Sequence, residues 1–176
     1  MPWARSRPSS IDPSPTTRVL VVCAGNICRS PTALGVLRHK LQAAGLHRQV
    51  EVDAAGTHGY HVGEAPDSRA IKHAALRGYD LSKLRARRVV AEDFDRFDWV
   101  LAMDRANLER LTEVAPTGAK ARVGLLMAHA SKPGSGDEVP DPYYGPPAGF
   151  ERVLDLVEDA CDGFIAKLGV SPDGTS

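Results

Sequence analysis

Nine residues, CAGNICRSP at positions 23–31, constrain the fold of this chain more than any other stretch. An apolar run at residues 19–22 precedes them and predicts a buried strand, and a helical pattern follows them over residues 32–44. The stretch is therefore expected to form a turn between the end of a strand and the start of a helix. Unpaired backbone N–H groups and the helix dipole point into such a turn, so it favours binding of an anion.

The side chains of this turn indicate that the anion is a phosphate. Cys23 stands at the end of the strand, where the helix field and a nearby guanidinium favour a thiolate over a thiol. Arg29 offers a planar fork of donors that suits phosphate better than a point charge does. Gly25 and Asn26 readily adopt positive φ, which turns successive amides inward. The expected phosphate-binding positions are Ala24, Gly25, Asn26, Ile27 and Cys28.

The next two residues fit the same context. Ser30 is a good N-cap residue and Pro31 a good first helical residue. The Ser30 hydroxyl could also donate to the sulfur of Cys23, which would steady the thiolate and ease its later departure. For Cys23 alone, a buried structural cysteine is an equal alternative. The whole motif argues against that alternative, because every position suits a strand–loop–helix context.

Composition limits the class of protein. The 176 residues carry 22 lysines and arginines and 22 aspartates and glutamates, so no global basic field indicates nucleic acid or an anionic membrane as a partner. No stretch approaches the length of a membrane span. The three cysteines are an odd number and residues 1–17 contain no apolar segment typical of a secretory signal, which together predict a reducing, cytoplasmic location.

One domain is expected between two flexible ends. Residues 1–17, rich in proline and serine, are predicted to be a disordered leader, residues 18–168 the domain, and residues 169–176 a flexible tail. Residues 131–150, rich in glycine and proline, are too long for a passive connection and are expected to form a functional loop. An amphipathic helix is predicted over about residues 150–168.

Strands and helices alternate along the domain. After the first strand, further strands are predicted at residues 50–54, 99–103 and 123–127. Asp67 and Asp104 are each positioned to cap a following helix. The alternation predicts an α/β fold, a single Rossmann-like domain with a four-stranded parallel sheet and helices on both faces. Ligands of such sheets bind beyond the carboxyl ends of the strands, where Cys23 stands.

The motif also resembles a known signature. Cys-x-Gly-Asn-x-Cys-Arg-Ser-Pro near the start of a small chain is similar to the signature of the low-molecular-weight protein tyrosine phosphatases. The resemblance extends from about residue 18 to residue 168. It implies hydrolysis of phosphotyrosine through a phosphocysteine on Cys23, with Arg29 as the phosphate clamp. No cofactor or metal is implied, and the sequence has no clustered His or Cys spacing typical of metal sites.

The leaving oxygen needs a proton donor, and Asp141 is the best candidate. From the residues alone, Pro-Asp-Pro at residues 140–142 reads more readily as a turn. Asp-Pro-Tyr-Tyr at residues 141–144 matches the general-acid loop of the family, so the resemblance implies that Asp141 is the general acid and then the general base. A bell-shaped pH dependence of the rate is expected, because Asp141 must be protonated while Cys23 is ionised. The expected catalytic set is Cys23, Arg29, Ser30 and Asp141.

An aromatic substrate is indicated by the residues expected around the site. Tyr60 matches an aromatic position in the family's substrate cleft, and Tyr143 and Tyr144 could wall a pocket for a ring. The branched apolar side chain of Ile27 suits the same flat ring. Phosphotyrosine-containing proteins are therefore the expected partners and inorganic phosphate the product, with no nucleic acid and no membrane involved. The protein is expected to be a monomer or a weak dimer.

Other polar residues leave alternatives open. Cys28 is either a small buried filler or, as the resemblance implies, the partner of Cys23 in a disulfide that forms reversibly on oxidation. His58 and His61 are expected to be surface residues. The basic run at residues 83–88 is interpreted as a solvated face, with weak steering of phosphorylated substrates as the alternative.

Two positions depart from the family pattern. Ala54 stands where many members carry a serine that supports the loop asparagine, and Lys83 stands where some members carry a histidine. Asn26 is therefore expected to be held differently.

Three rival functions fit the sequence less well. Arsenate reduction on the same fold relays a disulfide through cysteines near the middle of the chain, but none occurs between Cys28 and Cys161. Protein-arginine phosphatases tend to carry threonine at the position of Ile27. A catalytically dead phosphotyrosine-binding module would need a defect, and Cys23, Arg29 and Asp141 are all present.

Overall fold

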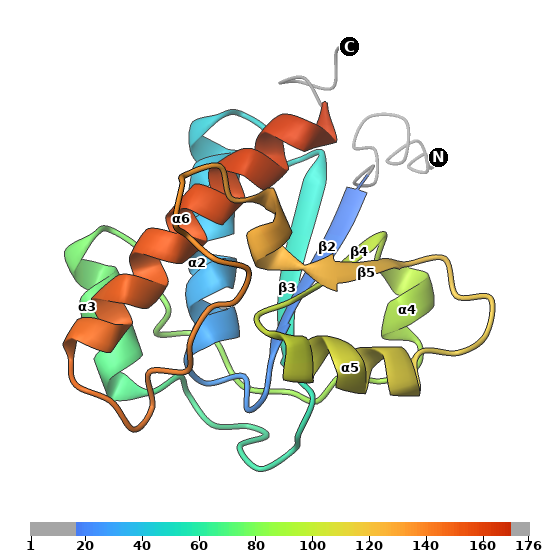
Figure 1. The fold of residues 1–176 in the computed structure, drawn as a ribbon, viewed down its shortest axis with the longest axis horizontal. Helices are drawn as coiled ribbons and strands as arrows, with labels where there is room; N and C mark the ends of the chain where they lie inside the picture. Colours follow the sequence, from blue (N-terminus) through green and yellow to red (C-terminus); the bar gives the residue numbers. More distant parts are fainter. Residues whose placement is uncertain (1–16, 170–176) are drawn as a thin grey trace, which may run out of the picture.

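The computed structural model describes residues 17–169 and contains one parallel sheet of four strands. The strands are β2 (Thr17–Cys23), β3 (Val50–Gly56), β4 (Trp99–Ala102) and β5 (Arg122–Leu125). Their order in the sheet is β3-β2-β4-β5, and every neighbouring pair is parallel (Figure 1). The predicted four-stranded parallel sheet is confirmed.

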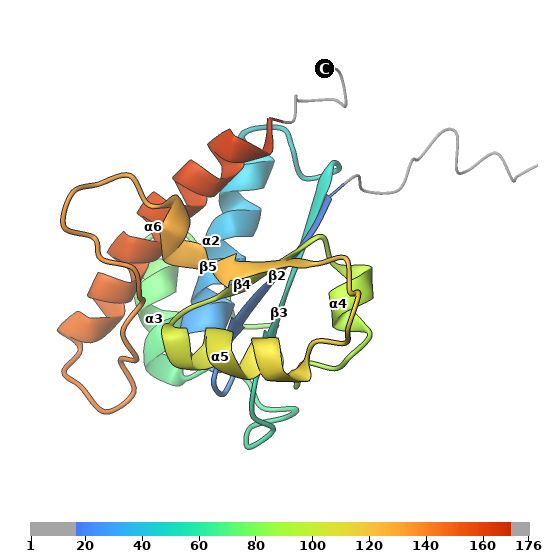
Figure 2. The ribbon, with the colours of Figure 1, turned by 45° about the vertical axis from the view of Figure 1, so that its right-hand side comes forward.

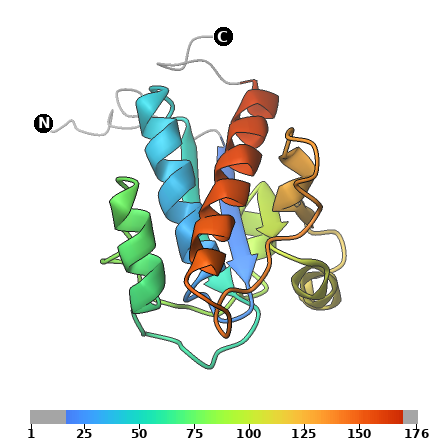
Figure 3. The same ribbon diagram turned by 60° about the vertical axis from the view of Figure 1, so that its left-hand side comes forward.

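Helices cover both faces of this sheet (Figures 2 and 3). The helices are α2 (Arg29–Ala43), α3 (Ser68–Leu76), α4 (Asp93–Arg96), α5 (Arg105–Val114), the 3-10 helix η1 (Leu126–His129) and α6 (Ala148–Leu168). Helices α2 and α6 lie side by side on one face with α3 beside them, and α4 and α5 lie on the other. Within residues 17–169, no helix is long and apolar enough to cross a membrane.

The two faces of β2 explain its continuous apolar sequence. Val19 and Val21 pack into the cluster formed with α2 and α6, whereas Leu20 and Val22 pack into the cluster that contains Phe94 and Leu111. All four β2 residues have no exposed surface. A strand buried on both faces has no reason to alternate apolar with polar residues, so β2 carries an uninterrupted run.

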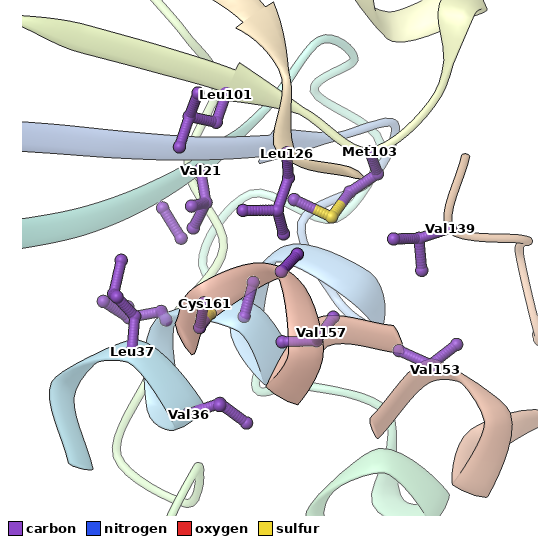
Figure 4. Packing of buried hydrophobic residues seen from close by; sticks show 14 of the residues in the cluster. Val21, Val36, Leu37, Leu101, Met103, Leu126, Val139, Val153, Val157 and Cys161 are labelled. Carbon is purple, nitrogen blue, oxygen red and sulfur yellow. The ribbon is translucent and has the colours of Figure 1, made fainter. Parts of the chain in front are cut away.

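The larger core lies between the sheet and helices α2 and α6 (Figure 4). Val21 and Leu101 from the sheet face Leu37 of α2 and Val157 of α6 across this layer. Cys161 of α6 lies in the same layer and is completely buried, and burial raises the pKa of its thiol.

Several boundaries differ from the predicted ones. Helix α2 begins at Arg29, so Cys28 and not Ser30 is its N-cap residue. Pro31 still lies in the first turn, where its missing N–H costs no helical hydrogen bond. Strand β5 ends at Leu125, and the chain continues as η1 where the strand was predicted to run on. Strand β2 begins at Thr17, a residue that was predicted to lie in the leader. The predictions of a disordered leader over residues 1–16 and of a flexible tail over residues 170–176 lie outside the described residues.

Two predicted helix caps are confirmed. The Asp67 carboxylate accepts a hydrogen bond from the backbone N–H of Arg69 at 2.8 Å. The Asp104 carboxylate accepts one from the backbone N–H of Asn107, also at 2.8 Å. Each helix start is thereby fixed next to the carboxyl end of the sheet.

The long connection between η1 and α6 is a loop, as predicted, and buried contacts anchor it. Asp159 of α6 accepts hydrogen bonds from the backbone N–H groups of Ser131 and Lys132 and from the hydroxyls of Ser131 and Ser135. Further along, the N–H of Val139 donates to the carbonyl of Met103 at 2.7 Å. These anchors bring residues 139–145, here called the acid loop, to the carboxyl end of the sheet.

Candidate active site

Residues 23–30, here called the Cys loop, join β2 to α2 at the carboxyl end of the sheet (Figure 1). Cys23 is 3% exposed. The backbone N–H of Asn26 donates to its sulfur at 3.3 Å, and the Ser30 hydroxyl lies 3.1 Å from the same sulfur. Donors of this kind favour a negatively charged sulfur, because a thiolate accepts hydrogen bonds more strongly than a thiol. Ser30 was predicted both to cap α2 and to contact Cys23, and only the contact is observed.

Asn26 shapes the loop from below. It adopts φ of 59°, a left-handed conformation that asparagine tolerates better than most residues. Its side-chain amide donates to the Ser30 hydroxyl at 2.7 Å, and its carbonyl accepts from the backbone N–H of Arg87 at 3.0 Å. Asn26 is therefore held by a backbone group across the site, which is consistent with the absence of a serine at Ala54.

Arg87 departs from the predicted solvated face. Its guanidinium pairs with the fully buried Asp93 at 3.0 Å and with Asp53 at 3.1 Å. Burial opposes its charge, but the hydrogen bonds and charge of Asp93 more than offset burial and raise the pKa of Arg87. The other basic residues of the run, Lys83, Arg85 and Arg88, are exposed. Arg87 thus fixes the backbone that supports Asn26.

Arg29 is the buried cation of the site. One guanidinium nitrogen donates to the Asp104 carboxylate at 2.6 Å and to the Val139 carbonyl at 3.0 Å, and the other lies 3.8 Å from the Asp141 carboxylate. Burial opposes the charge, but the Cys23 sulfur and Asp104 more than offset it and raise the pKa of Arg29. The guanidinium is therefore permanently charged and held in one orientation.

The segment after β3 packs directly against the Cys loop. The N–H groups of Thr57 and His58 donate to the carbonyls of Cys23 and Ala24, each at 2.9 Å. A Cβ atom at Gly56 would lie 2.7 Å from the Ala24 carbonyl oxygen, so the approach requires glycine. These contacts turn the carbonyls of the loop away from the site.

The Cys loop forms the floor of a pocket of about 320 Å³. Its lining residues are Cys23, Ala24, Gly25, Ile27, Cys28, Arg29, Tyr60, His61, Asp141, Tyr143 and Tyr144. Every residue predicted to be catalytic, phosphate-binding or part of the substrate pocket lines it, except Asn26 and Ser30, which lie beneath the floor. The aromatic rings stand at the mouth, where Tyr60 and Tyr144 are 79% and 94% exposed. Such a pocket can hold an anion at its base and a ring between its walls.

Asp141 stands on the exposed acid loop at the edge of this pocket. Its side chain is 53% exposed and accepts a hydrogen bond from the backbone N–H of Tyr143 at 3.1 Å. The rings of Tyr143 and Tyr144 meet edge to face with centroids 4.8 Å apart. A carboxyl group in this place can exchange protons with the solvent and with a group in the pocket.

The second cysteine of the loop differs from the first in its contacts. Cys28 is buried, and burial, followed by the nearby Asp67 carboxylate and the Cys23 sulfur, raises its pKa to about 12. Cys23, Cys28 and Cys161 are all free thiols. Among residues 17–169, no group of three or more His, Cys, Asp and Glu side chains gathers in a way that could hold a metal ion.

Comparison with known proteins agrees with this geometry. A family model described as low molecular weight phosphotyrosine protein phosphatase matches residues 18–171. The chain belongs to this family. A low molecular weight protein-tyrosine-phosphatase of Streptomyces coelicolor is 44% identical over 161 residues, which are 90% of this chain and 98% of the relative. The predicted family and enzyme class are confirmed.

Solved structures of similar proteins share the fold. A protein tyrosine phosphatase from Entamoeba histolytica gives a TM-score of 0.83 at 41% identity and covers 86% of this chain and 96% of its own. An arginine phosphatase from Drosophila gives a TM-score of 0.80 at 29% identity and covers 86% of this chain and 97% of its own. The fold class predicted for this phosphatase is confirmed.

Two residues contribute to the site of this low molecular weight phosphatase although the sequence did not predict it. Asp104 was expected only to cap α5, yet it also pairs with Arg29. Its place directly after β4, at the same end of the sheet as Cys23, was a usable signal. His61 was expected on the surface, but it lines the pocket, pairs with Glu64 at 2.9 Å and packs against Gly25. No local pattern distinguished His61 from His58, which is exposed as predicted.

Proposed function

We propose that this phosphatase hydrolyses phosphotyrosine in proteins through a covalent phosphocysteine on Cys23. The observation that carries the proposal is the convergence of three groups on one pocket. The Cys23 sulfur lies at its base, the Arg29 guanidinium is buried beside that sulfur, and the Asp141 carboxyl stands at its edge. A nucleophile, a fixed cation and a proton donor are the groups that phosphoryl transfer by this route needs.

In the first step, the Cys23 sulfur attacks phosphorus while the bond to the tyrosine oxygen breaks. The guanidinium of Arg29 and the amides of residues 24–28 stabilise the charge on the three non-bridging oxygens. Asp141, protonated at this stage, transfers its proton to the departing tyrosine oxygen. The Ser30 hydroxyl stabilises the sulfur before attack and again when it leaves.

In the second step, a water molecule attacks the phosphocysteine. Asp141, now a carboxylate, takes a proton from the water as the oxygen bonds to phosphorus, and the bond to Cys23 breaks. Inorganic phosphate leaves, and Asp141 is protonated again. Because the first step needs an ionised Cys23 and a protonated Asp141, the rate is expected to fall at both ends of the pH range.

The walls of the pocket support an aromatic substrate. Ile27 lies inside the pocket, and Tyr60 and Tyr143 flank its mouth. Two aromatic rings and a branched side chain offer flat apolar contact to a phenyl ring, which phosphoserine and phosphoarginine do not have. The arginine phosphatase from Drosophila shares the fold, so the choice of substrate depends on these side chains and not on the architecture.

The proposed activity is tested by turnover of phosphotyrosine, phosphoserine and phosphoarginine peptides in the presence of a chelator. Wild type is expected to hydrolyse phosphotyrosine, Cys23→Ser to lose this activity, and Asp141→Asn to slow it by about 100-fold or more. Preferred turnover of phosphoarginine would show that Ile27 had been misinterpreted. Binding of phosphotyrosine without turnover would leave a binding module and contradict the enzyme mechanism.

We also infer that the protein acts in the reducing cytoplasm as a monomer or weak dimer. Three free and buried thiols support a reducing compartment. Sedimentation of the full chain over a range of concentrations, combined with cell fractionation, tests both statements. A tight dimer at low concentration, or a secreted protein, would contradict them.

A further inference from the structure

The general acid stands at the tip of the acid loop, directly before the buried Pro142. The start of the acid loop is fixed by the hydrogen bond from Val139 to Met103, and the chain beyond it is anchored by the buried Phe150. Between these anchors, Asp141 is itself exposed and lies 3.8 Å from Arg29, which is beyond hydrogen-bond distance. A contact from another element can therefore add to Pro142 in fixing the direction of the Asp141 carboxyl group.

Arg69, at the start of α3, reaches across to this tip. One of its guanidinium nitrogens donates to the carbonyl of Tyr143 at 3.0 Å. The guanidinium carbon also lies 5.5 Å from the centre of the Tyr143 ring and 4.8 Å from that of Phe150. Arg69 thus contacts the backbone carbonyl of Tyr143, two residues after Asp141, and the aromatic rings of Tyr143 and Phe150.

The guanidinium of Arg69 is in turn held by Asp67. Two of its nitrogens donate to the two oxygens of the Asp67 carboxylate at 3.0 and 2.8 Å. The backbone N–H of Asp67 donates to the carbonyl of Ile27 at 2.8 Å. A continuous series of contacts therefore runs from the Cys loop through Asp67 and Arg69 to the acid loop.

We propose that Arg69, oriented by Asp67, is a positioning residue that holds the general acid in register with the nucleophile. The inference rests on the proposed function, in which Asp141 is the acid. Tyr143 supplies the link, because its carbonyl accepts from Arg69 and its N–H donates to Asp141 at 3.1 Å. Arg69 does not line the pocket, so it acts on the loop and not on the substrate.

An arginine is needed at this position because it has two tasks. Two nitrogens of its guanidinium donate to the Asp67 carboxylate, and one of these two nitrogens also donates to the carbonyl of Tyr143 on the acid loop. A lysine ammonium is a point charge without this fixed geometry. Displacing a reacting group by about 1 Å can cost about 100-fold in rate, so loss of the fork is expected to reduce acid catalysis.

The experiment compares substrates that need the acid with substrates that do not. A phosphotyrosine peptide has a basic leaving oxygen, whereas dinitrophenyl phosphate releases a phenolate that leaves without a proton. For Arg69→Gln, kcat/KM is expected to fall about 10-fold with the peptide and less than about 2-fold with dinitrophenyl phosphate. Arg69→Lys is expected to behave like Arg69→Gln. An equal fall with both substrates, or full activity of Arg69→Lys, would overturn the inference.

Arg77 provides the matched control. It follows α3 and pairs with Glu151, Asp155 and Glu158 of α6, away from the pocket. Arg77→Gln removes three ion pairs, more than the single pair with Asp67 that Arg69→Gln removes, and is expected to leave the ratio of the two kcat/KM values unchanged. A change in this ratio as large as that of Arg69→Gln would attribute the effect to helix packing and overturn the inference.

A double-mutant cycle separates this inference from the proposed function. In the Asp141→Asn background, Arg69→Gln is expected to have no further effect on peptide turnover, because its effect passes through Asp141. A full additional 10-fold loss would show an independent role and overturn the inference. If Asp141→Asn itself did not discriminate between the two substrates, the proposed acid would be wrong, and the inference would fall with it.

Discussion

At the scale of single residues, the site depends on charges that are held in place by neighbours. Arg29 is buried and always charged, and Asp104 determines where its fork points. Cys28 lies near Cys23, yet its thiol is kept protonated by burial and by Asp67. Similar side chains therefore have different tasks because their contacts differ.

We predict that Asp104→Asn lowers kcat/KM for a phosphotyrosine peptide by about 10-fold or more. Asparagine caps helices as well as aspartate does, so α5 is expected to remain intact while the charged hydrogen bond to Arg29 is lost. Steady-state kinetics with inhibition by inorganic phosphate measures the effect, and circular dichroism serves as the control for folding. Unchanged phosphate inhibition would show that Asp104 does not orient Arg29.

A second prediction concerns oxidation. Because the pKa of Cys28 is about 12, its thiol stays protonated at neutral pH and is expected to react poorly with peroxide itself. Peroxide is expected to oxidise Cys23 to a sulfenic acid, which the Cys28 sulfur then attacks, so that a disulfide forms and water is released. Wild type is then expected to regain activity with a thiol reductant after brief peroxide treatment. Cys28→Ser is expected to regain much less of its own untreated activity. Equal recovery by both proteins would contradict a protective Cys23–Cys28 disulfide.

At the scale of elements, close packing of α6 against η1 leaves no space for a side chain. A Cβ atom at Gly163 would lie 1.8 Å from the carbonyl oxygen of His129, a backbone group that cannot rotate away. Trp99, His129 and Phe164 surround this contact with edge-to-face rings. The contact therefore sets the distance between α6 and the end of the sheet.

Gly163→Ala is expected to lower the free energy of unfolding by about 1–3 kcal/mol, because the helix must shift to relieve the clash. Gly124→Ala is the matched control, since nothing lies within 4 Å of a Cβ atom at that position in β5. Urea unfolding of both variants measures the difference. Equal stability of the two variants would contradict this account of the α6–η1 contact.

At the scale of the whole molecule, carboxylates that tie distant segments together make stability depend on pH. Burial opposes ionisation of Asp159, but hydrogen bonds from Ser131 and Lys132 outweigh burial and lower its pKa. A hydrogen bond from Arg69 lowers the pKa of Asp67. The folded protein therefore binds fewer protons than the unfolded chain in mildly acidic solution.

Because their pKa values are lower in the folded protein, Asp67 and Asp159 are expected to contribute fully to stability above the unfolded pKa of aspartate, about 4. This contribution is expected to be lost as pH falls through the lower folded pKa values. Urea unfolding at a series of pH values measures the slope. Asp159→Asn removes one of these groups, so it is expected to be less stable at neutral pH and to show a smaller loss in acid. An identical slope for wild type and variant would show that Asp159 contributes nothing to acid unfolding.

The sequence by itself determined the features that consecutive residues encode. The Cys loop, its strand and its helix follow from residues 19–44, because the chemistry of an anion-binding turn is local. Alternation of strands and helices was sufficient for the fold class, since parallel strands need helical crossovers. Asp141 and the tyrosines beside it were found through a family resemblance, because their own pattern is that of an ordinary turn.

Only the tertiary structure decided how distant residues support the site. Asp104 is 75 positions from Arg29, and Tyr143 is 74 positions from Arg69, so no sequence pattern links either pair. Helix α2 also begins at Arg29, before Pro31, which was predicted to be its first residue. The Ser30 hydroxyl contacts Cys23 and Asn26 and does not cap the helix. Sheet order places the carboxyl ends of β2 and β4 side by side, and the ion pair between Arg29 and Asp104 follows from that arrangement.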